Sequence, residues 1–97
     1  MPELEALLER VEDKFSFYAF VEALARDRRQ SVLEEARSPS NAYAADAQGW
    51  ENTTVETFLE AALAWAEASD MGAAQGLPDG PSWKVFAIFL YCGKIYE

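Results

Sequence analysis

The clearest alternation of apolar and polar positions lies in residues 53–66. Apolar side chains recur there at intervals of three and four residues, which is the period of an amphipathic helix. They form one stripe about 120° wide, made of Val55, Phe58, Leu59, Ala62, Leu63 and Ala66. Thr53 and Glu56 fit a capping box at the start of this helix, and Asn52 is the alternative cap. The pattern predicts a central helix whose stripe faces the core.

Two further helices are predicted before it, because the apolar pattern changes phase near residues 13–16. The first begins near Pro2, and the second has Ser16 as a plausible cap. Their apolar positions are Leu4, Leu7, Leu8 and Val11, and then Phe17, Phe20, Val21 and Leu24. Farther along, the stripe falls on Arg28 and Ser31, so the core-facing pattern fades. Helix persists to about Arg37, where the Ser-Pro pair that follows ends it.

The second half contains two connections and a last helix. Residues 38–52 are polar and rich in alanine; they either pack through Tyr43 and Trp50 or are partly mobile. Glycine and proline mark residues 69–82 as a loop. A last helix is predicted from Pro81 or Ser82, and Gly93 is a natural residue to end it. Its apolar residues lie on most sides, which indicates a helix buried between others or one at a dimer interface.

These elements predict an all-α fold: a single domain, residues 1–97, that is a bundle of about four helices, antiparallel or orthogonal. The predicted core consists of Leu4, Leu8, Val11, Phe17, Phe20, Val21, Leu24, Phe58, Leu59, Leu63, Phe86 and Leu90.

Composition narrows the classes of function. The chain has 17 acidic and 8 basic residues and a net charge of −9, which argues against nucleic-acid binding and suits a basic protein partner. An acidic surface also serves solubility, which is the simpler alternative. The chain has no histidine, so the commonest general base and metal ligand are missing. We therefore expect a protein that is not an enzyme and has no catalytic residues, metal or cofactor.

Cys92 is the single cysteine and favours a reducing compartment. Neither a signal peptide nor a membrane span is visible, so the expectation is a cytoplasmic protein without a membrane partner, either a monomer or a homodimer.

The candidate binding residues are tryptophans and their neighbours. Trp50, Glu51 and Asn52 precede the central helix, and the Thr53–Glu56 capping box and the core periodicity leave all three unexplained. Trp65 and Trp83 complete the set. Packing at the core or its edge is the favoured interpretation of Trp50 and Trp65, and exposure in a binding surface is the alternative.

Several runs of sequence are similar to a family of small acidic bacterial proteins catalogued as a domain of unknown function. The similar residues are Gly49-Trp50-Glu51-Asn52-Thr53-Thr54, Phe58-Leu59-Glu60-Ala61, Ala64-Trp65, Pro81-Ser82-Trp83, Phe86-Ala87 and Gly93-Lys94-Ile95-Tyr96-Glu97, with Phe17, Ala19-Phe20-Val21 and Leu24 earlier. Residues 30–48 are the least typical part. The resemblance implies no activity, substrate or catalytic residue.

Two functions are compatible with these observations. The first is an acidic protein–protein interaction module, an inhibitor or immunity-type partner of a basic protein. The alternative is a small-ligand-binding or regulatory domain with a pocket lined by Trp50, Trp65 and Trp83.

Overall fold

The computed structural model describes residues 3–41, 44–78 and 80–97, and these residues form a bundle of four α-helices. The helices are α1 (Leu4–Glu9), α2 (Lys14–Arg37), α3 (Val55–Ser69) and α4 (Trp83–Ile95), and two 3-10 turns are η1 (Ala47–Gly49) and η2 (Ala73–Gln75). Within the described ranges, the β-pairing is limited to one bridge between Asp46 and Trp50. The prediction of an all-α fold with four helices is confirmed.

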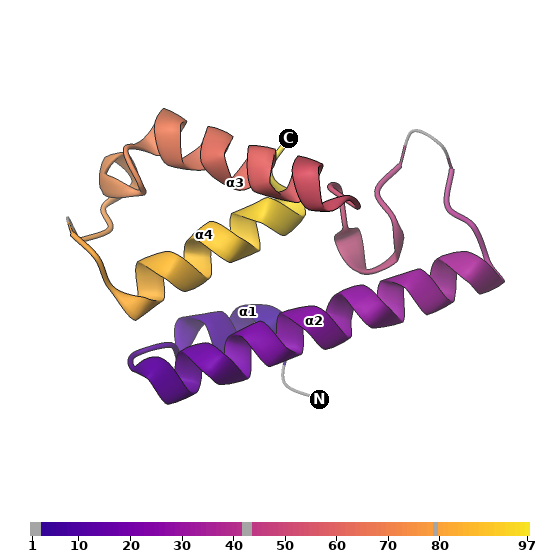
Figure 1. Cartoon of the computed structure of the whole chain (residues 1–97), viewed down its shortest axis with the longest axis horizontal. Coiled ribbons are helices and arrows are strands. Elements are labelled where there is room, and N and C mark those ends of the chain that lie inside the picture. Colours follow the sequence, from indigo (N-terminus) through magenta and orange to yellow (C-terminus); the bar gives the residue numbers. More distant parts are fainter. Residues whose placement is uncertain (1–2, 42–43, 79) are drawn as a thin grey trace.

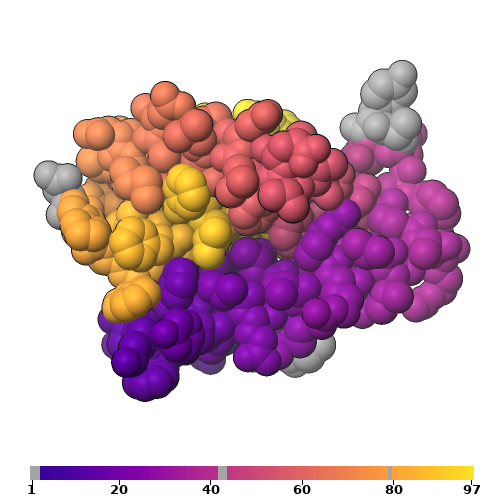
Figure 2. All heavy atoms as spheres, in the orientation of Figure 1, coloured from indigo at the N-terminus to yellow at the C-terminus, as the bar shows by residue number. Residues whose placement is uncertain are grey.

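The helices pack as two antiparallel pairs (Figure 1). The first pair is α1 with α2, and the second is α3 with α4. In this view α4 lies between α3 and α2, and α3 forms the upper edge of the molecule. The C-terminus returns to the start of α3. Atoms of α4 reach the surface between α3 and α2 on the face shown in Figure 2.

The helix α2 begins one turn earlier than its predicted cap. Asp13 is the N-cap, and its Oδ1 accepts a hydrogen bond of 2.8 Å from the backbone N–H of Ser16. The Ser16 hydroxyl accepts in return from the N–H of Asp13, so Ser16 is the third residue of a reciprocal capping box rather than the cap. The end of α2 at Arg37 is confirmed. The predicted start of the first helix at Pro2 lies outside the described residues.

The buried face of α2 continues after Leu24, contrary to the prediction. Ser31 is fully buried and the Asp27 side chain is largely buried, so the stripe continues with polar side chains. The spacing from Phe20 through Leu24 and Asp27 to Ser31 is four, three and four residues, which keeps all of these positions on one helical face. The apolar residues of this face end at Leu24, but its buried positions continue to Ser31.

The predicted core is correct around α1 and for most of the first half of α2, where Val21 is the exception. Phe20 is inaccessible to solvent, and Leu4, Val11 and Leu24 are buried with it, together with Trp50 and Ala87. The partly buried side chains that pack against this cluster include Leu8, Phe17, Phe58 and Leu90. Val21, Leu59, Leu63 and Phe86 were predicted to be in the core and are exposed.

The helix α3 is rotated relative to its predicted orientation. Its buried side chains are Ala61, Ala62, Trp65 and Ser69, whereas Val55, Leu59 and Leu63 point to solvent. The small side chains of Ala61 and Ala62 let the backbones of α3 and α4 approach closely, and the large indole of Trp65 is buried on the same face.

Gly93 shows the same close approach from the side of α4. A Cβ atom at this position would lie 2.8 Å from the ring of Phe58. The prediction that Gly93 ends the last helix is therefore wrong. Gly93 lies inside α4, which continues to Ile95. The predicted start is correct, since Ser82 caps α4 by accepting from the N–H of Val85.

The cap of α3 lies one residue after the predicted one. Thr54, not Thr53, accepts a hydrogen bond of 3.1 Å through its hydroxyl from the N–H of Thr57. The Thr57 hydroxyl accepts in return from the N–H of Thr54. The predicted partner, Glu56, is an acidic residue in the first turn of the helix, where the helix dipole favours its charge.

The two neighbouring threonines give a matched test of this cap. We expect Thr54→Ala to lower the free energy of unfolding by about 1 kcal/mol, because it leaves a backbone N–H of the first turn without its acceptor. Thr53→Ala should change it by less than about 0.5 kcal/mol, the usual range for an exposed side chain. Urea unfolding followed by circular dichroism measures both. A larger loss for Thr53→Ala would contradict the observed cap.

Candidate functional site

Asp27, at the middle of α2, joins three parts of the chain. Its Oδ2 atom accepts a hydrogen bond of 2.8 Å from the indole Nε1 of Trp50 and lies 2.7 Å from the Lys94 ammonium near the end of α4. The side chains of Lys94 and Asp27 are only 6% and 17% exposed. The Lys94 ammonium also lies over the Trp50 ring, 5.6 Å from its centroid. One carboxylate therefore fixes both the connection before α3 and the end of α4.

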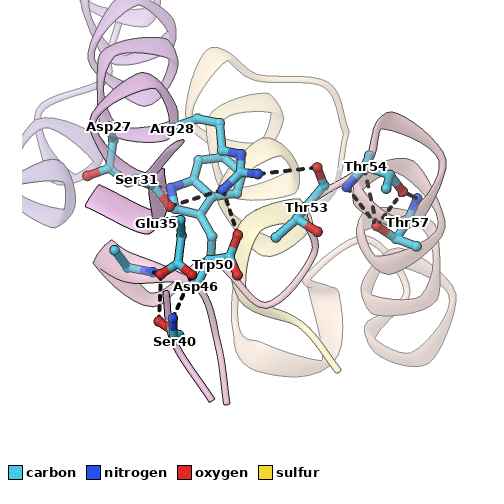
Figure 3. Close-up of polar contacts among 11 residues, drawn as sticks. Asp27, Arg28, Ser31, Glu35, Ser40, Asp46, Trp50, Thr53, Thr54 and Thr57 are labelled. Atoms are coloured by element: carbon cyan, nitrogen blue, oxygen red, sulfur yellow. Dashed lines mark hydrogen bonds and ion pairs between the residues drawn. The ribbon is translucent and has the colours of Figure 1, made fainter. Parts of the chain in front are cut away.

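Arg28 extends this junction toward the surface. Figure 3 shows its guanidinium pointing toward Asp46 and Thr53, where it donates to the Asp46 carboxylate at 3.3 Å and to the Thr53 carbonyl at 3.4 Å. It also donates to the buried Ser31 hydroxyl and lies over the Trp50 ring. Arg28 thus serves to hold the connection against α2.

Glu35 anchors the first part of that connection. Its carboxylate accepts hydrogen bonds from the N–H and hydroxyl of Ser40 and from the N–H of Ala47. The Ser40 hydroxyl, and then the two backbone N–H groups, lower the pKa of Glu35. Residues 38–52 were predicted either to pack through Tyr43 and Trp50 or to be partly mobile. Trp50 packs as the first alternative predicts, and Tyr43 lies outside the described residues.

Asn52 closes the chain end onto the start of α3. Its Nδ2 donates to the carbonyl of Gly93 at 3.0 Å and to that of Tyr96 at 2.8 Å. The backbone N–H of Glu51 donates to the carbonyl of Lys94. Asn52 therefore satisfies carbonyls at the end of α4 and is not the N-cap of α3. The Glu51 side chain is exposed, and the neighbouring Glu97 carboxyl raises the pKa of Glu51.

The structure brings together only some of the predicted binding residues. Trp50, Glu51 and Asn52 meet the end of α4 at this junction. Trp65 is buried elsewhere and donates through Nε1 to Gln75. Trp83 lies at the start of α4, partly exposed, with its ring 5.3 Å from that of Phe17. Packing is therefore the role the structure shows for Trp50 and Trp65.

A hollow of about 330 Å³ opens beside the first half of α4, and only apolar side chains line it: Phe17, Met71, Phe86, Phe89 and Leu90. A second hollow of about 330 Å³ shares Met71 and Phe86 with it and extends to the loop after α3. None of the three tryptophans lines either hollow.

The turn that carries Met71 has its backbone in the left-handed region. Asp70, Met71 and Gly72 have φ values of 53°, 53° and 88°. Glycine suits position 72 because its φ of 88° strains any other residue, and a Cβ there would also displace the Leu77 side chain. For Asp70 and Met71 this conformation costs about 1–2 kcal/mol each. The strained turn places the flexible Met71 side chain in both hollows, and strain of this kind gathers at binding sites.

The net negative charge is concentrated in the middle of the sequence, because the basic residues lie outside it. Residues 38–83 contain seven acidic residues and no lysine or arginine. Three of them, Glu56, Glu60 and Glu67, are exposed on α3, next to exposed Val55, Leu59 and Leu63. The surface of α3 is therefore both apolar and negative.

Metal binding and cysteine chemistry were the other two possibilities for the described residues. In the described part of the chain, no three Cys, Asp or Glu side chains come close enough together to hold a metal ion. Cys92 is buried, and burial raises the pKa of its thiol to about 11, so it is a poor nucleophile at neutral pH. Every buried side-chain nitrogen or oxygen in the described residues has a hydrogen-bond partner.

The sequence reasoning missed Asp27 and Lys94, which form the central ion pair of the junction. A signal was present for Asp27, because it continues the stripe of Phe20 and Leu24. No comparable signal marks Lys94, whose partner is 67 residues away in the chain.

The family model for a family of unknown function, DUF7660, matches residues 13–97. The chain belongs to this family. The match begins at the Asp13 cap of α2 and leaves α1 outside it. Comparison with curated proteins gave no match, and neither did comparison with solved structures. Over the described residues, no helix combines the length and the apolar character needed to cross a membrane.

The Asp27 junction has a matched control on the same helix. We expect Asp27→Asn to lower the free energy of unfolding by about 3 kcal/mol, since it leaves the buried Lys94 ammonium without a counter-charge. Glu22→Gln breaks the exposed Glu22–Arg26 pair, whose side chains are 72% and 61% exposed, and should cost less than about 0.5 kcal/mol. Urea unfolding gives both values, and equal effects would mean that the junction contributes no more than a surface pair.

Proposed function

We propose that the protein is a non-enzymatic acidic interaction module that binds a basic protein, in the manner of an inhibitor or immunity protein. The observation that carries the proposal is the distribution of charge. Seven acidic residues and no basic ones occupy residues 38–83, and the helix in their midst exposes Val55, Leu59 and Leu63. An exposed apolar patch beside charge of a single sign is typical of a protein-binding surface.

The use of the interior polar groups supports a binding role. Asp27, Lys94 and Trp50 satisfy one another, and Arg28 is engaged with Asp46. These side chains hold the fold together and present no acid, base or nucleophile to solvent. The proposal places the protein in the cytoplasm, which the free Cys92 thiol supports.

The test is the salt dependence of a purified complex. The protein is used to capture partners from cells that produce it, and each captured protein is then expressed and purified. We expect a partner with a basic isoelectric point, whose Kd rises at least tenfold between 50 and 400 mM NaCl because added salt shortens the Debye length. Calorimetric titration measures the Kd. A partner of acidic or neutral charge, or a Kd indifferent to salt, would overturn the proposal.

A second candidate function, binding of a small apolar ligand, is favoured by the hollow beside Met71. Its volume of about 330 Å³ is at the lower end of the range for ligand pockets, about 300–1,000 Å³. Its lining offers no hydrogen-bonding side chain, however, and ligand pockets usually contain a few. An apolar molecule is therefore the only class of small ligand that suits it.

Indole and toluene are suitable probes of this second function. A probe at a free concentration of about ten times its Kd stabilises the fold by about 1.4 kcal/mol. This stabilisation raises the Tm by about 5–10 °C for a domain of this size. Phe86→Ser should abolish the shift, because Phe86 lines the hollow. Val32→Ser, which changes an exposed residue of α2, should keep it. No shift with the unaltered protein would remove this candidate.

A further inference from the structure

The outer face of α3 has the pattern of a helix that packs on another helix. Val55, Leu59 and Leu63 are spaced four residues apart and are 74%, 52% and 54% exposed. Side chains four residues apart form a ridge along a helix, and such ridges fit the grooves of a second helix. Among the described residues α3 packs against α4 and η2, and in Figure 1 no other helix lies above it. The described part of the chain therefore leaves this ridge largely open to solvent.

A row of carboxylates runs along one edge of this ridge. Glu56, Glu60 and Glu67 fall within about 40° of one another on the helix, directly beside the apolar ridge, at roughly 100° of rotation per residue. All three side chains are exposed, and α3 contains no lysine or arginine. The helix thus carries an apolar stripe with a negative charge along one side only.

From these two features we infer that α3 is the docking surface for a basic amphipathic helix of the partner. The inference rests on the proposed function and adds the surface and the form of the partner. The apolar side chains of the incoming helix pack on Val55, Leu59 and Leu63, and its lysines or arginines lie along the carboxylate row. From Val55 to Glu67 the surface is about 18 Å long at 1.5 Å per residue, which corresponds to about three turns of partner helix.

Charge disfavours a second copy of the chain at the same place. Each copy carries the same three carboxylates beside the ridge and a net charge of −9. Pairing the two ridges would bring like charges to one interface, and like charges across an interface are unfavourable. The same carboxylates attract a partner of opposite charge.

A synthetic helix provides the probe. It is a fluorescein-labelled peptide of about 14 residues with leucines on one face and lysines along one edge, and fluorescence anisotropy in 100 mM NaCl gives its Kd. We expect Leu59→Ser combined with Leu63→Ser to raise the Kd at least tenfold. We expect the same of the triple change Glu56→Gln, Glu60→Gln and Glu67→Gln, together with a weaker salt dependence.

Two matched controls separate this surface from general charge attraction. Leu33→Ser changes another exposed leucine, on α2, and the triple change Glu3→Gln, Glu9→Gln and Glu12→Gln removes the same charge outside α3. Each should change the Kd less than twofold. Because the altered side chains are exposed, thermal melts should show folded proteins; Val55→Ser, at the most exposed position of the ridge, is the substitute if the double variant does not fold.

The inference is overturned if the unaltered protein does not bind the peptide, or if the control triple weakens binding as much as the α3 triple does. It is also overturned if the protein sediments as a dimer that the serine changes dissociate, since α3 would then be a self-association face. The proposed function fails separately. A captured basic partner that binds in a salt-dependent manner, and is unaffected by the α3 changes, would refute this surface alone.

Discussion

One carboxylate decides how the second half of the chain sits on the first. Asp27 accepts from Trp50 and pairs with Lys94, so the long connection and the end of α4 both meet α2 at a single oxygen atom. Removing two charges from water is costly, and the cost is repaid only when the pair has good geometry and every polar partner is satisfied. Here the Trp50 indole N–H donates to the same carboxylate oxygen, and the Trp50 ring lies next to the Lys94 ammonium. Asn52 then holds the chain end beside this junction.

Local rules predicted the helices well, because their signals lie within a few residues. The start of α4 at Ser82 and the end of α2 at Arg37 depend on a side-chain cap and on a following proline. The shifts at Asp13 and Thr54 have one cause. Neighbouring polar residues offered more than one cap, and the reciprocal partners were Ser16 and Thr57, whereas the usual capping box has glutamate or glutamine at that position.

The orientation of α3 was not predictable from hydrophobicity alone. The largest apolar stripe was assigned to the core, but α4 presents Gly93 at the contact and leaves room for the ring of Phe58 and for helices in close approach. Alanine then suits the inner face better than leucine does, because it lets the backbones come together. For the same reason the tryptophans could not be grouped from the sequence, since Trp65 and Trp83 belong to contacts set by tertiary packing.

The rotation of α3 also explains why the outer face of this helix is apolar. If Val55, Leu59 and Leu63 faced the core, the outer face would be a solvated helix flank with an ordinary acidic charge. Because Ala61, Ala62 and Trp65 fill the inner face, Val55, Leu59 and Leu63 are half or more exposed to solvent, where they stabilise the isolated fold less than buried side chains would. The exposure of this apolar stripe costs solubility, which the adjacent carboxylates offset. Under the proposed function, this apolar stripe and the carboxylates beside it contribute to binding rather than to folding.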